Sequence, residues 1–101
     1  MARRVVGFGL VRCLSIEPVG DDVPNDWAWR LAYVGLTGYL DLFESEKKKP
    51  GAQFIKFSSV ESSDDRWFLR SYFGTHEIKE NEFVFVTENT KYTFRLYLRE
   101  S

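Results

Sequence analysis

The sequence predicts a mainly β protein, a small antiparallel barrel or sandwich of about six or seven strands. Short stretches rich in β-branched and aromatic residues recur along the chain, and polar, glycine or proline residues separate them. The C-terminal fifth also has the pattern of a β-hairpin. With 101 residues and no repeat or linker, the chain is expected to form one domain over residues 1–101.

The hairpin is predicted in residues 82–99, where two apolar runs flank a polar break. One face would carry the aromatic and aliphatic side chains Phe83, Phe85, Phe94 and Leu96. These side chains share a face only if the loop has an even number of residues, which places Thr87 opposite Tyr92. The loop would then be residues 89–90 or residues 88–91. This face should meet the core, and the opposite face should be exposed.

The N-terminal run, residues 5–17, is predicted to be a central buried strand, because both of its faces are fairly apolar. Gly7 and Gly9 would permit a bend or a bulge in it. Residues 18–25 contain proline, glycine, aspartate and asparagine and should form a loop.

Residues 27–34 alternate between large and smaller side chains, so we expect a strand that pairs antiparallel with the N-terminal one. In that strand Trp27, Trp29 and Tyr33 would share a face. Such a face could line a cavity for a small ligand.

Residues 35–49 fit two structures. As a helix near residues 38–49, the segment places apolar side chains at helical spacing and ends in three lysines before Pro50. As a strand, it places Leu36, Leu40 and Leu42 on one face. The helix is the favoured interpretation, which would make the fold α+β.

The second half of the chain is predicted to hold further short strands. Residues 53–60 form one, and residues 75–78 form another. Residues 64–73 could begin as a helix, but the aromatic content of residues 67–73 favours a strand.

The composition limits the classes of function. A net charge of −1 and a pI near 5.8 disfavour a dedicated nucleic-acid binder. The single cysteine, Cys13, excludes an internal disulfide and agrees with a reducing, cytoplasmic setting. The basic residues 1–4 precede a run that is interpreted as a strand rather than a signal peptide. No apolar run approaches the length of a membrane-spanning helix, so we expect no membrane association.

The sequence contains none of the motifs that mark the common catalytic mechanisms. His76 is the only histidine, and Glu80 occupies the position where a zinc-protease helix carries its second histidine. Cys13 lies in an apolar run and should be a buried hydrophobic residue. We therefore expect no catalytic residues, no metal site and no cofactor. The sequence favours a protein that is not an enzyme but does not decide this.

Aromatic residues make up 17% of the chain, more than a small core needs, and arginines are interleaved with them. Two predicted strand faces combine the two residue types. The first carries Arg66, Phe68, Arg70 and Tyr72, and the second carries Arg95, Tyr97 and Arg99. If the two faces coincide, they form a surface suited to protein binding, since arginine and tyrosine are favoured at interfaces.

The leading hypothesis is a small binding protein without catalytic activity that recognises a protein partner or a second copy of itself through this surface. One alternative is a small-molecule-binding barrel or minimal enzyme whose cavity is lined by Trp27, Trp29 and Tyr33. The other alternative is a single-stranded nucleic-acid binder that uses the arginine and aromatic face.

Overall fold

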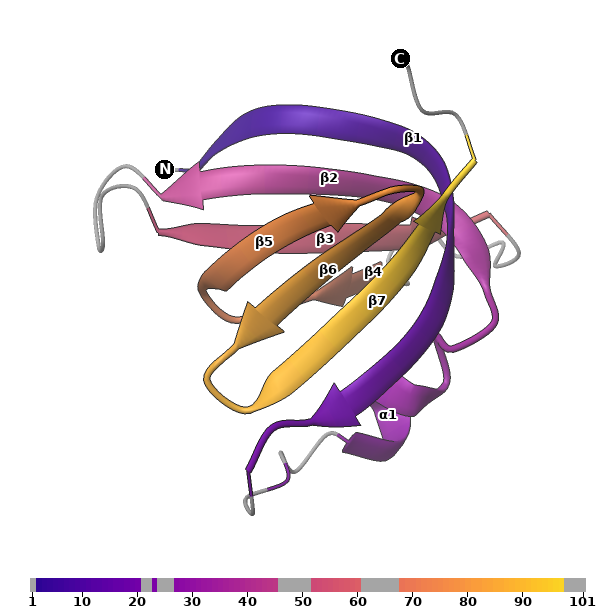
Figure 1. Ribbon diagram of the computed structural model, residues 1–101, viewed down its shortest axis with the longest axis vertical. Coiled ribbons are helices and arrows are strands. Elements are labelled where there is room, and N and C mark those ends of the chain that lie inside the picture. The colour runs from indigo at the N-terminus through magenta and orange to yellow at the C-terminus, as the bar shows by residue number, and fades with distance from the viewer. Residues whose placement is uncertain (1, 21–22, 24–26, 46–51, 61–67, 98–101) are drawn as a thin grey trace.

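The computed structural model describes residues 2–20, 23, 27–45, 52–60 and 68–97 (Figure 1). These residues form one antiparallel sheet of seven strands and one short helix, which confirms the predicted mainly β fold. The elements are β1 (Ala2–Pro18), α1 (Trp27–Leu31), β2 (Thr37–Ser45), β3 (Gln53–Ser59), β4 (Phe68–Arg70), β5 (Gly74–Lys79), β6 (Glu82–Thr87) and β7 (Thr90–Leu96).

The sheet has the strand order β2-β1-β7-β6-β5-β3-β4, and β2 also pairs with β3. Because of this additional pairing, the sheet closes on itself as a barrel. β4 is attached to β3 beside the closed ring and is hydrogen-bonded to no other strand of the described chain.

Two stretches of chain turn the corners of the barrel. The first half of β1 pairs with β2, whereas residues 11–18 pair with β7. β4 and β5 make the second corner, because β4 pairs with β3 and β5 pairs with β6. In Figure 1, β5, β6 and β7 therefore run obliquely across β2 and β3. Bulges in β1, together with Gly9 at φ +71°, accommodate the first corner.

The core fills the space between these two layers. Its fully buried members are largely aromatic and aliphatic side chains that point inward from the strands, with Tyr33 added from the turn after α1. The largest are Tyr33, Phe57, Phe83, Phe85, Tyr92 and Phe94. Ring contacts link Tyr33 and the four phenylalanines of this set, such as Phe57 with Phe94 at a centroid distance of 5.3 Å. The core is therefore held by aromatic packing.

The hairpin formed by β6 and β7 has the predicted faces but a different register. Phe85 lies opposite Tyr92, so the loop is residues 88–89 and the predicted pairing of Thr87 with Tyr92 is wrong by two residues. The Thr87 hydroxyl accepts the backbone N–H of Thr90 at 3.1 Å, which fixes the turn at residues 88–89. An even loop preserves the side-chain parity, and the four predicted apolar residues are buried.

The favoured helix near residues 38–49 is wrong for the part that the structure describes. Residues 37–45 are β2, a strand with hydrogen-bonded neighbours on both sides, and residues 46–51 lie outside the described chain. Pairing with β1 and β3 outweighs the helical spacing of the apolar residues. At Gly38 the fit is close, because a Cβ atom there would lie 2.1 Å from the carbonyl oxygen of Ser58.

The strand predicted for residues 27–34 is also wrong, because this segment forms α1 and a following turn. Its inward-facing residues recur every third position, as in a tight helical turn. They are Trp27, Arg30, Tyr33 and Leu36. Strand parity would have placed Arg30 away from Tyr33, whereas both are buried.

The remaining strand predictions agree with the structure where it describes the chain. β1 and β3 cover the predicted residues 5–17 and most of 53–60, and β5 contains residues 75–78. β1 is central, between β2 and β7, but the predicted burial of both its faces is wrong, because Val5 and Val6 are 46% and 39% exposed. In the ambiguous segment 64–73, residues 68–70 form β4, and residues 61–67 are not described.

Candidate functional site

The outer surface of the β2–β3–β4 layer carries a cluster of aromatic and cationic side chains. We call this surface the aromatic–cationic face and define it by Phe43, Phe54, Lys56, Phe68 and Arg70. The strand register builds it, since Phe43 lies opposite Phe54 and Lys56 lies opposite Arg70. A shallow hollow of about 220 Å³ lies between these five side chains.

Phe54 is the centre of this face, and it is only 5% exposed although it points away from the core. The Phe43 ring stacks on it at a centroid distance of 5.1 Å, and the Phe73 ring meets it edge-on at 5.8 Å. The Arg70 guanidinium carbon lies 4.6 Å from the centre of the same ring. An outer-face phenylalanine is thus enclosed by two rings and a cation.

The charges on this face are unbalanced. Lys56 lies between Asp41 on β2 and Arg70 on β4, and Asp41 also meets Arg4 at 3.6 Å. Among the residues that the structure describes, this row therefore holds three cations, Arg4, Lys56 and Arg70, and one carboxylate, Asp41. Lys56 and Arg70 are like charges placed directly opposite each other, which costs stability. Each lies over an aromatic ring, with the Lys56 ammonium 4.5 Å from the centre of Phe68.

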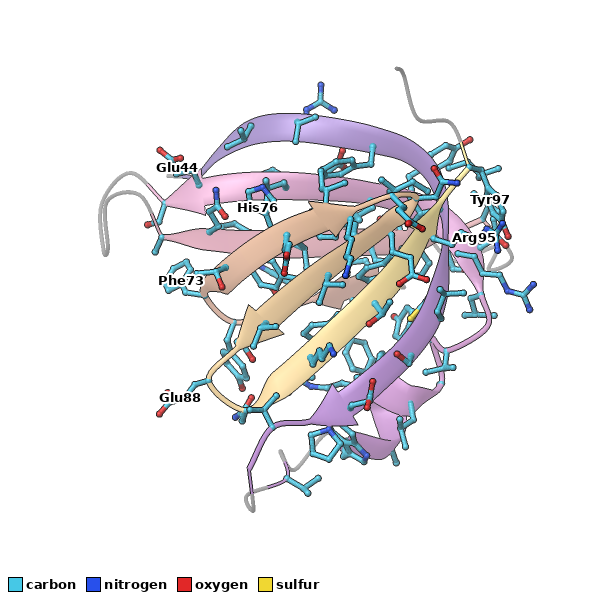
Figure 2. The ribbon with its side chains drawn as sticks, viewed as in Figure 1. Glu44, Phe73, His76, Glu88, Arg95 and Tyr97 are labelled. Carbon is cyan, nitrogen blue, oxygen red and sulfur yellow. The ribbon has the colours of Figure 1, made fainter. Side chains whose placement is uncertain are left out.

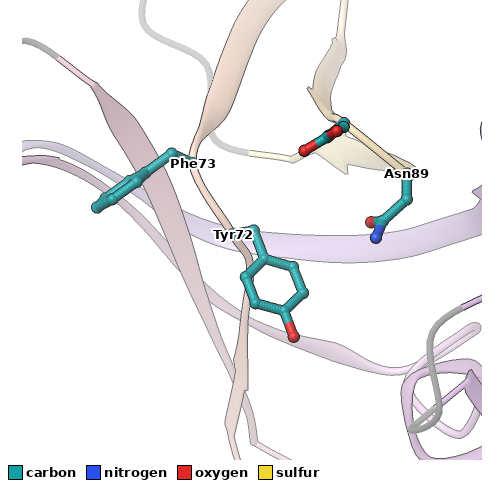
Figure 3. Close-up of a pocket in the computed structure, with 4 residues that line it drawn as sticks. Tyr72, Phe73 and Asn89 are labelled. Carbon is teal, nitrogen blue, oxygen red and sulfur yellow. The ribbon is translucent and has the colours of Figure 1, made fainter. Parts of the chain in front are cut away.

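A separate cleft of about 330 Å³ lies between the link from β4 to β5 and the β6–β7 turn (Figure 3). Tyr72 and Phe73 line one side and point away from each other, and Glu88 and Asn89 line the other. Thr90 donates its hydroxyl hydrogen to the Asn89 side-chain oxygen at 3.0 Å, which holds this side chain at the edge of the cleft.

Behind Tyr72 lies a buried cation. The guanidinium carbon of Arg30 is 5.1 Å from the centre of the Tyr72 ring, and Arg30 donates a hydrogen bond to the Tyr92 hydroxyl. Arg30 is 2% exposed, so it supports the cleft from inside and does not line it.

The two arginine- and aromatic-bearing faces predicted from the sequence are not brought together. Phe68 and Arg70 lie on the aromatic–cationic face, and Tyr72 is exposed beside it. Arg95 and Tyr97 are exposed at the end of β7, on the opposite side of the molecule from Phe73 (Figure 2). The other two predicted residues, Arg66 and Arg99, lie outside the described residues.

The three aromatic residues predicted to line a cavity do not share a face. Trp27 packs against the core, and Trp29 is 41% exposed. Tyr33 is fully buried between Trp29 and Phe57, with ring centroids 5.2 and 6.1 Å away. Burial raises the pKa of the Tyr33 phenol above its ordinary value.

The reactive residue types occupy structural positions. Nδ1 of His76 lies 2.6 Å from the side-chain oxygen of Gln53 and joins β5 to β3. Burial raises the pKa of the Cys13 thiol to about 12, so it is protonated at neutral pH and a poor nucleophile. Among the described residues, no cluster of histidine, cysteine and acidic side chains could hold a metal ion.

The sequence analysis missed Phe43, Phe54 and Lys56. One signal was present, because Phe54 has the opposite strand parity to Ile55 and Phe57, which left an aromatic side chain on the outer face of that strand. Phe43 lay in the segment assigned to a helix, so its position beside Phe54 was not foreseen.

Within the described parts of the chain, no helix combines the length and the apolar character needed to cross a membrane. Comparison with protein-family models, with curated proteins and with solved structures finds no match to this chain.

Proposed function

We propose that this protein is a small binding protein without catalytic activity, and that its aromatic–cationic face holds an acidic group of a protein partner. The observation that supports this most directly is the pairing of Lys56 with Arg70 across β3 and β4. Two cations directly opposite each other lower the stability of a sheet. A carboxylate bound between them offsets that repulsion.

The surrounding rings supply the rest of an interface. Phe43, Phe54 and Phe68 give an apolar surface beside the two cations. Aromatic and arginine side chains at the centre of an interface contribute most of the binding energy in many complexes. The face therefore suits a protein segment that carries apolar side chains together with an acidic one.

The proposed setting is the cytoplasm, where a single reduced cysteine is usual. The partner is another protein or a second copy of this chain in a homodimer. A free small ligand and a single-stranded nucleic acid have less support, because a shallow hollow encloses a small molecule poorly and the chain has a net charge of −1.

Selection from a library of random displayed peptides tests the proposal, because the peptides sample many sequences and the partner need not be identified first. The wild-type protein should enrich peptides that contain aspartate or glutamate beside apolar residues. In Arg70→Glu and Lys56→Glu variants this enrichment should be lost, and the selected acidic peptides should bind at least about tenfold more weakly.

Arg95→Glu is the matched control, because it makes the same charge change on the exposed end of β7, on the opposite side of the molecule from Phe73. It should leave the affinity within about twofold. Equal loss in Arg95→Glu and Arg70→Glu would indicate nonspecific attraction between charges. That result, or a wild-type selection without acidic peptides, would overturn the proposal.

A further inference from the structure

β4 offers an open strand edge beside the aromatic–cationic face. On one side it pairs with β3, in the register that places Leu69 opposite Phe57. It has no second strand partner within the described chain. A strand edge of this kind presents unpaired backbone groups that another extended chain can join.

The hydrogen-bond pattern defines which backbone groups are available. The N–H of Ser71 donates to the carbonyl oxygen of Ile55 at 3.1 Å, so Ser71 is directed toward β3. Backbone groups in a strand alternate between its two neighbours, and Leu69 is therefore directed the same way as Ser71. The N–H and C=O groups of Phe68 and Arg70 then point to the open edge.

We propose that the protein partner supplies an extended segment that pairs with this edge of β4 and adds a strand to the sheet. In this arrangement an acidic side chain lies opposite Arg70, and an apolar side chain lies opposite Phe68. Both belong to the outer face of the extended sheet, because side chains opposite each other share a face. The acidic character rests on the proposed function, whereas the strand pairing rests on the backbone of β4.

Charge argues for an acidic segment rather than a second copy as the occupant. Antiparallel pairing of two β4 edges about Leu69 would place Phe68 opposite Arg70 of the second copy. The two Arg70 side chains would then lie diagonally across the pair, each beside its own Lys56. Among the described residues, two copies would bring together four cations, two Arg70 and two Lys56, with only the Asp41 carboxylate of each copy beside Lys56. An acidic segment instead adds negative charge next to Arg70.

Two variants of the protein separate the contribution of the Phe68 backbone N–H to peptide binding from the contribution of the Phe68 ring. Phe68→Ala removes the ring and keeps the N–H, whereas Phe68→Pro removes both. Proline is tolerated where its missing N–H faces away from the neighbouring strand, so both variants should fold, and thermal unfolding checks this. Binding is measured by fluorescence anisotropy with the labelled peptide acetyl-Thr-Val-Thr-Glu-Thr-Val-amide. We expect Phe68→Pro to bind this peptide at least about fivefold more weakly than Phe68→Ala.

The peptide provides the complementary test. One version is N-methylated at its valine and glutamate amides, and the other at its threonine amides. One of these alternate sets faces β4, so one version should lose binding at least about tenfold and the other should bind nearly normally. The sensitive set also identifies whether the added strand is parallel or antiparallel.

The possible failures are distinguishable. If both methylated peptides bind equally while Arg70→Glu abolishes binding, the strand pairing is wrong and the proposed function stands. If Arg70→Glu changes nothing, the proposed function is wrong as well. If the protein without peptide forms a dimer that Phe68→Pro dissociates and Phe68→Ala does not, a second copy occupies the edge, and the inference is overturned.

Discussion

At the scale of single residues, Arg30 shows how a buried charge is accommodated in a core rich in aromatic side chains. It is 2% exposed, it donates to the Tyr92 hydroxyl, and it lies against the Tyr72 ring. A buried guanidinium that loses a hydrogen-bond acceptor retains its desolvation cost. The Tyr92 hydroxyl should therefore contribute to stability.

Tyr92→Phe should lower the free energy of unfolding by about 1–3 kcal/mol, because it removes an acceptor from a buried charge. Urea denaturation followed by fluorescence measures this. Tyr72→Phe keeps the ring against Arg30 and removes an exposed hydroxyl, so it should change stability by less than about 0.5 kcal/mol. Equal effects of the two variants would contradict this role for the Tyr92 hydroxyl.

Cys13 gives a prediction with a defined pH range. Burial raises the pKa of its thiol from 9.0 to about 12, so the ionised form is disfavoured in the folded state. The stability that the protonated thiol contributes is fully present below the pKa of the unfolded thiol. It is lost as the pH rises from about 9 toward 12, because the thiol then ionises in the unfolded state but not in the folded state. The wild type should therefore lose more stability than Cys13→Ala over that range.

Alkylation by iodoacetamide at about pH 8 provides a second measurement on the same thiol. The native protein should react at least about tenfold more slowly than the protein unfolded in urea. Rapid alkylation of the native protein would mean that Cys13 is accessible, in conflict with its complete burial.

At the scale of elements, the corner between β4 and β5 depends on Gly74. This residue pairs with Gln53 of β3 and with Thr87 of β6, so it lies where the chain passes from one layer to the other. A Cβ atom there would lie 2.1 Å from the carbonyl oxygen of Val86, which is part of the backbone and cannot rotate away.

Gly74→Ala should therefore destabilise the protein by about 3 kcal/mol or more, because β5 must shift away from β6. The comparison is Gly9→Ala, which has open space around the Cβ position and only the strain of φ +71°. Its cost should be about 1–2 kcal/mol. Chemical denaturation measures the free energy of unfolding of both variants. A larger loss of stability in Gly9→Ala than in Gly74→Ala would contradict the prediction.

The elements also show what a sequence can predict. The β6–β7 hairpin was predictable because its signal is local. Only the position of its turn differed, because hydrogen bonds among Thr87, Asn89 and Thr90 select residues 88–89 as the loop. For α1 and β2 the predictions were reversed. Residues 27–34 alternate in size like a strand, and residues 36–43 carry helical spacing, but contacts with distant strands determine both structures.

The same limit applies to the candidate site. Alternation alone placed Phe68 and Arg70 on one outer face. Their partners Phe54 and Lys56 lie on a different strand, and the register between β3 and β4 is set by pairing between segments that are separated in the sequence. No local sequence pattern contains that register, so the pairing of Lys56 with Arg70 could be recognised only in the structure.

At the scale of the whole molecule, the backbone amides should be unevenly protected from hydrogen exchange around the barrel. Residues 75–79 of β5 are all exposed, and beyond Gly74 this strand pairs only with β6 in the described chain. β1 and β7, in contrast, contribute fully buried residues to the core. Local opening should therefore begin at β5.

Hydrogen exchange followed by mass spectrometry tests this expectation. Peptides that cover β5 should exchange at least about tenfold faster than peptides that cover the paired halves of β1 and β7. Uniform exchange of all strands would mean that the barrel opens only as one unit.

The corner in β1 has a consequence for how the protein is made. Residues 11–18 pair with β7, the last strand in Figure 1, so this half of β1 leaves the ribosome long before its partner does. During that interval β2 can pair with the first half of β1 and β3 can pair with β2, but the edge of residues 11–18 has no strand partner yet. Contacts between distant parts of a chain form slowly, and uncovered edges invite association with other chains. We therefore expect residues 11–18 to be open to association with other chains until β7 has been made.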